Sequence, residues 1–251
     1  MTPHTGSAQL SRMAWPALPE RPLVLVPLGS FEQHGPHLPL DTDTRIADAV
    51  ARGAAGRLRQ RRPREPVVVA PSVVYAASGE HQSFPGTISI GNEALRFMLV
   101  ELVRSMCVWS GRIVFVNAHG GNLRCLAETA RQLTEEGQDV AWVPCQTETV
   151  DAHAGHTETS LMLHLVPDLV DMTLARKGNP APIAELLPAI IAGGVSAVSP
   201  SGVLGDPTTA TAEGGARVLD DLVADVATRI EDGRLGTDGR LCSAQAEPCR
   251  P

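Results

Sequence analysis

Short apolar runs alternate with segments of helical periodicity along most of the 251-residue chain, and this alternation limits the folds it can adopt. The apolar runs predict buried strands at 23–28, 67–75 (interrupted by Pro71), 113–116 and 140–143. Apolar residues at helical spacing predict helices at 44–61, from Asn92 (as N-cap) to 106, at 123–134, at 158–166, around 183–191 and at 209–231. This order predicts an α/β protein, a three-layer α/β/α fold with a mainly parallel sheet.

The chain is expected to form a single domain over residues 1–251, because it contains no internal repeat, no long linker and no break in composition. The Pro-rich, aperiodic residues 1–20 predict a loosely held N-terminal arm. The polar residues 233–251 predict a disordered tail.

Composition excludes several classes of partner. Lys and Arg total 21 against 28 Asp and Glu, and only 3% of residues are aromatic, so neither a nucleic-acid surface nor a base-stacking platform is expected. No apolar run approaches the roughly 18 residues of a membrane span, so no membrane association is expected. The five cysteines include no CxxC pair, which predicts reduced thiols in a cytoplasmic protein.

Six of the eight histidines lie in four short polar segments, and the first of these, residues 32–43, follows a predicted strand. Glu32 and His34 are two residues apart, so in an extended segment both side chains leave the same face. Asp43 follows before the next helix and can fold back toward them. Two carboxylates and an imidazole suit a divalent transition metal. The alternative is a loop in which Asp43 caps the helix and the histidines lie at the surface.

The second segment, 117–122, occupies the equivalent place after another strand, and open parallel sheets bind ligands beyond the carboxyl ends of their strands. It contains His119 followed by Gly120 and Gly121, which let the backbone approach a ligand closely. It matches neither a P-loop nor a GxGxxG motif. A histidine here is either a metal ligand or a structural residue, and its position favours a ligand.

The third segment, 153–158, opens a predicted helix. Glu158 lies on the same apolar stripe as Leu161, Met162 and Leu165, so it projects toward the core, where a cation would satisfy its charge. The alternative is a glutamate that only stabilises the helix N-terminus through the dipole. The fourth segment, 78–87, follows the second strand. Its candidate substrate-contact residues, to which Gly120 is added, are Ser78, Glu80 and His81; a plain surface turn is the alternative.

Five candidate ligands, Glu32, His34, Asp43, His119 and Glu158, exceed the three that a single catalytic zinc takes from protein. They fit two cations roughly 3.5–4 Å apart with one bridging carboxylate, an arrangement suited to amide hydrolysis. His153 then remains for proton transfer to the leaving nitrogen. The chain has no GxSxG or HExxH motif, so serine-hydrolase and zincin mechanisms lack support.

These motifs, in this order and spacing, resemble those of the creatininase family of metal-dependent amidohydrolases. The resemblance rests on Glu32-Gln-His-Gly, Asp43, Phe84-Pro-Gly-Thr, Asn117-x-His-Gly and the helix that starts at Glu158. It implies a layered α/β/α domain, a ring-like homo-oligomer and two divalent ions per chain (Fe²⁺, Zn²⁺ or Mn²⁺). Glu32 and His119 would hold one ion, His34 and Glu158 the other, with Asp43 bridging, and His153 would act on the substrate. Gly120-Gly121 replace a Tyr-Glu pair of creatininase itself, which disfavours creatinine as the substrate.

Within that family, the stretches 35–47, 77–84, 151–160 and 202–212 are similar to the branch that acts in mycofactocin biosynthesis. This resemblance implies a peptidase that cleaves the modified C-terminal Val-Tyr unit from a ribosomal precursor peptide. The alternatives are a family hydrolase of a small cyclic amide or formamide, and a non-catalytic metal-binding subunit.

Overall fold

A parallel four-stranded sheet forms the centre of the molecule. The computed structural model describes residues 9–146 and 151–243. In it β1 (Leu23–Leu28), β2 (Val67–Val69), β3 (Arg112–Asn117) and β4 (Val140–Pro144) are arranged in the order β2-β1-β3-β4. Every neighbouring pair is parallel, with Leu25 opposite Val69 on one side and Val114 on the other. Since the strands point the same way, their carboxyl ends share one edge.

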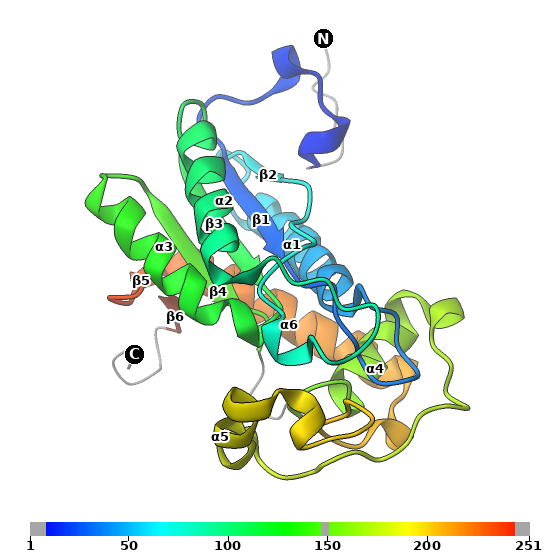
Figure 1. The fold of residues 1–251 in the computed structure, drawn as a ribbon. Coiled ribbons are helices and arrows are strands. Elements are labelled where there is room, and N and C mark those ends of the chain that lie inside the picture. The colour runs from blue at the N-terminus through cyan, green and yellow to red at the C-terminus, as the bar shows by residue number, and fades with distance from the viewer. Residues whose placement is uncertain (1–8, 147–150, 244–251) are drawn as a thin grey trace.

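Helices cover both faces of this sheet (Figure 1). Three of them, α1 (Thr42–Arg61), α4 (His156–Leu165) and α6 (Ala212–Asp232), pack on the face that includes Leu25 and Val114. The opposite face, which includes Val26 and Phe115, is covered by α2 (Gly91–Met106) and α3 (Leu123–Glu135). Side chains of the strands thus alternate between two hydrophobic layers, as residues in doubly covered strands must. The predicted three-layer α/β/α fold is confirmed.

Several element boundaries differ from the sequence prediction. Helix α1 begins at Thr42, two residues early, so Asp43 lies in its first turn and is not part of the preceding loop. Helix α4 begins at His156 rather than at 158. Asn92 lies inside α2 and is not its N-cap, which is Ile90. Strand β2 ends at Val69, because Pro71 interrupts the ladder before the isolated bridge from Leu28 to Val73.

The remaining segments lie around this framework. Helix α5 (Ile183–Gly193) lies beyond the carboxyl edge of the sheet and, with the turn Val195–Ala197, contacts the turn Gly79–His81. The short strands β5 (Arg234–Leu235) and β6 (Leu241–Cys242) pair with each other in a region expected to be disordered, and residue 240 bridges to Trp142 of β4. The remaining short helical turns are Leu10–Arg12, Trp15–Ala17, Gly120–Asn122, Pro167–Leu169 and Pro207–Thr209.

The cysteines only partly follow the prediction of reduced thiols. Cys107, Cys125 and Cys145 are free, whereas Cys242 is disulfide-bonded. The prediction is wrong at Cys242, because spacing along the chain does not show which thiols meet in space. Cys249 lies outside the described residues. Within the described residues, no helix is long and apolar enough to cross a membrane.

Candidate metal centre

The carboxyl edge of the sheet brings together the five residues proposed as metal ligands. Glu32 and His34 follow β1, Asp43 lies in the first turn of α1, His119 follows β3, and Glu158 lies in the first turn of α4. Four of them are no more than 5% exposed, and the Glu158 side chain is 16% exposed. The first two segments therefore lie at strand ends and the third at the start of a helix, as the sequence predicts.

Glu32, Asp43 and His119 form one group of facing side chains. His119 Nδ1 lies 3.3 Å from Glu32 Oε1 and 3.2 Å from Asp43 Oδ2. The opposite ring nitrogen, Nε2, donates to the carbonyl oxygen of Ala77 at 3.0 Å. That bond keeps a proton on Nε2, so Nδ1 is the ring nitrogen that would face a cation together with the two carboxylates.

His34 and Glu158 form a second group on the other side of Asp43. His34 Nε2 lies 3.0 Å from Asp43 Oδ1 and 3.9 Å from Glu158 Oε2, and its Nδ1 donates to the carbonyl oxygen of Glu32 at 3.1 Å. The two oxygens of Asp43 thus face different histidines, His34 and His119. This is the arrangement expected of a carboxylate that bridges two cations.

Local packing fixes Asp43 at this position. Glycine is required at residue 29, because a Cβ there would lie 2.4 Å from the backbone of Thr44. The Thr44 hydroxyl donates to the carbonyl oxygen of Ser30 at 2.9 Å, and the Ser30 hydroxyl donates to Asp43 Oδ2 at 2.8 Å. The end of β1 and the start of α1 are therefore joined directly beside the ligands.

The start of α4 is held in a comparable way. Asp151 accepts hydrogen bonds from the backbone N–H groups of His156 and Thr157, which caps the helix. Ala154 adopts a positive φ of 52°, which costs a non-glycine residue energy, and its N–H donates to Glu158 Oε2 at 2.6 Å. This hydrogen bond fixes one oxygen of the Glu158 carboxylate beside the centre.

His153 also reaches the centre, and its backbone exchanges two hydrogen bonds with Leu204. Its Nδ1 lies 3.9 Å from Glu32 Oε1, while Nε2 lies 2.8 Å from the carbonyl oxygen of Gln33. His153 is 7% exposed, and it belongs with His34 and Glu158 to one set of potential ligand atoms within 4.8 Å of one another. It is close enough to act on a substrate bound to this centre.

The segment predicted to contact substrate contributes more directly than expected. His81 is buried, with Nε2 3.2 Å from Glu32 Oε1. Glu80 is 28% exposed, with Oε1 3.5 Å from His119 Nε2. A Cβ at Gly121 would lie 2.5 Å from that same oxygen, so the glycine leaves space for the Glu80 carboxylate. Ser78 is fully buried, and Gly120 is exposed beside the centre.

Sequence reasoning placed His81 in a substrate-contact segment, and in the structure its ring also faces Glu32. It gave no role to Gln33, whose side chain contacts both His81 and His153. The position of Gln33 between two predicted ligands was the only available signal. His37 is buried and bonded to Thr159, and His156 is exposed, so these two histidines lie outside the centre.

The pKa values of the carboxylates and imidazoles in the centre are shifted, because the buried carboxylates are not balanced by enough positive charge. Burial raises the pKa of Glu32 and of Glu158 to about 7. Burial by itself would lower the pKa of His34 and His119, but attraction to the neighbouring carboxylates outweighs it and raises the pKa of each to about 10. In metal-free protein, protons therefore hold the carboxylates together.

A divalent cation would supply the missing charge. Both carboxylate oxygens of Glu32 are buried without a hydrogen-bond partner, although such groups are normally satisfied. Carboxylate oxygens and imidazole nitrogens are ligands for zinc, manganese and iron(II). The residues present therefore fit a metal site.

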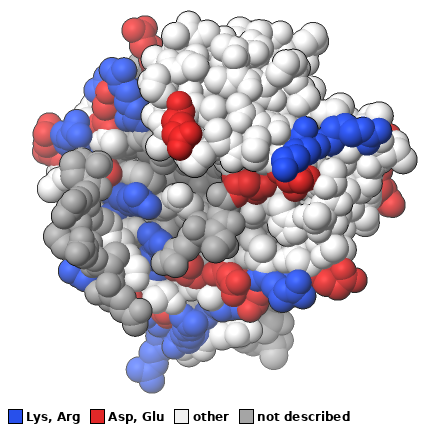
Figure 2. Space-filling view, turned by 90° about the horizontal axis from the view of Figure 1, so that it is seen from below, with Lys and Arg blue, Asp and Glu red and all other residues white. Residues whose placement is uncertain are grey.

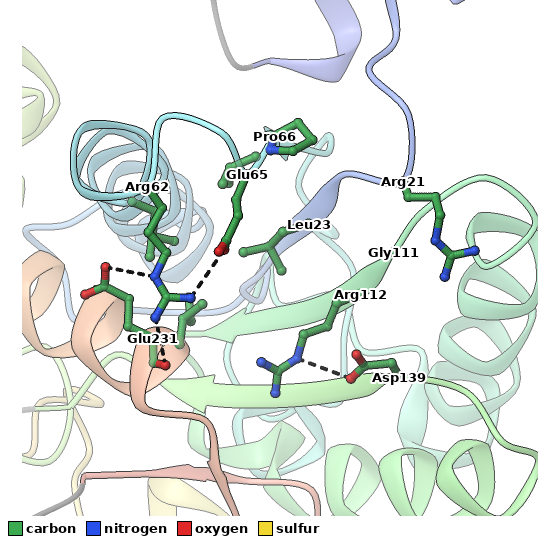
Figure 3. A pocket seen from close by; sticks show the side chains of 12 residues that line it. Arg21, Leu23, Arg62, Glu65, Pro66, Gly111, Arg112, Asp139 and Glu231 are labelled. Atoms are coloured by element: carbon green, nitrogen blue, oxygen red, sulfur yellow. Dashed lines mark hydrogen bonds and ion pairs between the residues drawn. The ribbon is translucent and has the colours of Figure 1, made fainter.

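A pocket of about 240 Å³ lies at the opposite edge of the sheet, where β1, β2 and β3 begin (Figure 3). Its Arg62 pairs with Glu65 and Glu231, and its Arg112 pairs with Asp139. These arginine and carboxylate charges are therefore matched within the pocket. On the face in Figure 2, acidic and basic side chains are interspersed around a broad uncharged area, so this face is not expected to attract a polyanion.

Comparison with known proteins agrees with this description. Residues 11–230 match the creatininase family, described as creatinine amidohydrolase. A "Mycofactocin precursor peptide peptidase" from Mycobacterium ulcerans is 56% identical over 224 residues, covering 88% of this chain and 89% of that protein. A protein of the same description from Mycolicibacterium smegmatis is 54% identical over 220 residues, with the same coverage.

Solved creatininase structures share the fold. One described as "Creatininase Mn" has a TM-score of 0.73 and 25% identity, and covers 91% of this chain and 99% of that chain. A mutant creatininase of "Zn-Zn type" has a TM-score of 0.72 at the same identity and coverage. Those descriptions name divalent metals in relatives of similar fold.

Proposed function

The chain belongs to the creatininase family and is a hydrolase of amide C–N bonds, and we propose that it is a metal-dependent peptidase acting on the mycofactocin precursor peptide. It would remove the modified C-terminal Val-Tyr unit. The observation that carries the proposal is the buried carboxylate–imidazole cluster around the unpartnered Glu32. The identity of 52–56% to four peptidases of that description supports the substrate.

We assign the metal-holding roles by the two groups of facing side chains. Glu32 and His119 would hold one ion, His34 and Glu158 the other, and Asp43 would bridge them. When bound, two divalent ions supply Lewis-acid chemistry, which polarises a carbonyl group and lowers the pKa of water. Iron, zinc and manganese all fit these ligands.

The chain's own residues would handle the proton. In amide hydrolysis a water oxygen bonds to the carbonyl carbon, the C–N bond breaks, and one proton moves from the water to the leaving nitrogen. His153 Nδ1, 3.9 Å from Glu32 Oε1, is placed to accept that proton and return it. Glu80, Gly120 and the segment 78–87 border the partly exposed side of the centre and would contact the peptide.

The test is a cleavage assay with the modified precursor peptide. Protein purified without oxygen is loaded separately with iron(II), zinc or manganese, and loss of the C-terminal unit is followed by mass spectrometry. Cleavage with at least one metal is expected. An intact peptide with all three metals would refute the proposal, and turnover of a small cyclic amide or formamide would then indicate the other hydrolase function.

We also propose a cytoplasmic homo-oligomer, as the family resemblance implies and as suits a substrate made on ribosomes. Light scattering of the metal-loaded protein measures the subunit number. A monomer at micromolar concentration would contradict the oligomer.

A further inference from the structure

The side chain of Gln33 has a defined orientation in the metal centre. It is 5% exposed and lies between two proposed ligands in the sequence. The backbone N–H of Gly35 donates to Gln33 Oε1 at 2.9 Å, and an amide nitrogen could not accept that bond. The oxygen is thereby placed on Gly35, and the NH₂ group must face the histidines.

That orientation determines the tautomer of His81. Gln33 Nε2 lies 2.7 Å from His81 Nδ1, and because the amide nitrogen only donates, Nδ1 must be bare. A neutral imidazole carries one proton, so in His81 the proton is on Nε2. This N–H faces Glu32 Oε1 at 3.2 Å. A nitrogen that carries a proton has no lone pair left for a cation.

The backbone of Gln33 determines the tautomer of His153, which presents a bare nitrogen to the centre where His81 presents an N–H. His153 Nε2 lies 2.8 Å from the Gln33 carbonyl oxygen, which only accepts, so Nε2 carries the proton and Nδ1 is bare. The Gln33 amide nitrogen also lies 3.0 Å from His153 Nε2 and could donate to it if Nε2 were bare. However, a bare Nε2 would face the Gln33 carbonyl oxygen at 2.8 Å, and two acceptors at that distance repel each other. The second amide hydrogen faces the Gly202 carbonyl oxygen at 3.4 Å.

We propose that His81 is a hydrogen-bond donor to the substrate and not a metal ligand, and that Gln33 is the positioning residue that makes it so. The proposal rests on the proposed amide-hydrolase function of the same centre. The imidazoles of His81 and His153, whose ring centroids are 4.4 Å apart, then have different roles in the reaction. His153 presents a bare nitrogen for a proton, and His81 presents an N–H to the negative charge that develops on the carbonyl oxygen.

A neighbouring glycine supports the role of Gln33. Gly202 has a φ of +80°, and a Cβ there would lie 1.8 Å from Gln33 Oε1 and 2.6 Å from Gln33 Nε2. Only glycine leaves room for the amide in its observed orientation. The loop that carries Gly202 therefore holds Gln33 against the histidines.

Zinc content tests whether His81 is a ligand. We expect His81→Leu to bind as much zinc as the wild-type protein, with unchanged affinity, while kcat for the precursor falls roughly 10²–10³-fold. His81→Gln keeps an N–H donor and should recover a large part of kcat. A loss of one zinc per chain, or a 100-fold weaker zinc affinity, in His81→Leu would overturn the proposal even if no activity is found for any form.

The role of Gln33 is tested with Gln33→Glu, whose carboxylate accepts a hydrogen bond from His81 Nδ1 and so moves the proton away from Nε2. In zinc-loaded full-length protein with ¹⁵N-labelled histidine, NMR should show His81 with a bare Nδ1 in the wild type and a protonated Nδ1 in the variant. The His81 signals are identified by their absence in His81→Leu. Gln60→Glu, on an exposed glutamine near the end of α1 and away from the centre, is the control and should change neither the tautomer nor kcat. A His81 Nδ1 that is protonated or metal-bound in the wild type would refute the proposal.

Discussion

Replacing Gly215 by alanine should destabilise the protein and distort the metal centre from a distance. Gly215 lies in the first turns of α6, where this helix packs on α4. A Cβ at this position would lie 1.8 Å from the carbonyl oxygen of Ser160 and 2.4 Å from its carbonyl carbon. Real Cβ contacts essentially never fall below 3.0 Å, so the two helices must separate locally by about 1.2 Å.

The expected free energy combines two opposite effects. Forcing a methyl group into a packed interface costs about 1–3 kcal/mol. Gly→Ala in a helix interior gains about 0.5–1 kcal/mol from the backbone entropy of the unfolded chain. The clash here is with backbone, which cannot rotate away, so we take the upper end and expect a net loss of about 2 kcal/mol. Glu158 lies two residues before Ser160, and a shift of about 1 Å exceeds the roughly 0.5 Å that a catalytic geometry tolerates.

Gly56→Ala is the matched control. Gly56 is an exposed glycine inside α1, and a Cβ there meets nothing within 4 Å. This variant should be more stable than wild type by about 0.5–1 kcal/mol. Urea unfolding at one protein concentration gives both values, with unchanged slopes. Elemental analysis should show metal loss only in Gly215→Ala. If both variants gain stability and retain metal, the inferred contact between α6 and α4 is wrong.

Three further predictions concern the centre itself. Asp43→Ala should lose both metals, because its two oxygens face both histidine groups; full metal content in the variant would refute the bridging role. Gly121→Ala should weaken metal affinity roughly 10–100-fold, because its Cβ would lie 2.4 Å from the Ala77 carbonyl oxygen and 2.5 Å from both Glu80 Oε1 and His119 Nε2, whereas Gly120→Ala, with open space at its Cβ, should not; calorimetric titration of zinc into both compares them. In metal-free protein the pKa of His34 and His119 is raised to about 10 from about 6.5, so the stability they contribute is present below pH 6.5 and is lost as pH rises toward 10. As the pH is raised from 7 to 9, the urea midpoint of unfolding should therefore decrease for the metal-free protein and stay constant for the zinc-loaded protein. An equal dependence of the midpoint on pH in both states would contradict this.

Periodicity was sufficient for the layers of the fold and for the edge that carries the centre. Apolar runs that are followed within a few residues by Glu32 and His34, or by His119, place these residues beyond strand ends in a parallel sheet. It could not supply the strand order β2-β1-β3-β4, because pairing between strands depends on contacts distant in sequence. Periodicity also did not predict that α1 begins at Thr42, because the turn that places Asp43 depends on the close approach of Gly29 to Thr44.

Residues that act through another residue are harder to predict than ligands. A glutamate or histidine in a strand-end loop carries a chemical signal of its own, but Gln33 acquires its role only from what folds around it. Its oxygen is oriented by Gly35, its nitrogen meets His81 from a different loop, and its space depends on Gly202, far along the chain. No pattern within one segment contains those contacts.

The distribution of the ligands has a consequence for stability. They come from the ends of β1 and β3 and from the starts of α1 and α4, so ions bound here would join both strands to the helices of one layer. A metal that binds only the folded chain stabilises it by about 2.7 kcal/mol at a free concentration of 100 Kd. Without it, the same place holds a glutamate whose pKa is raised to about 7 by burial, so its charged form destabilises the fold at neutral pH. The two effects have the same origin, because the burial that disfavours the charged Glu32 in the free protein also places its oxygens where a cation would bind.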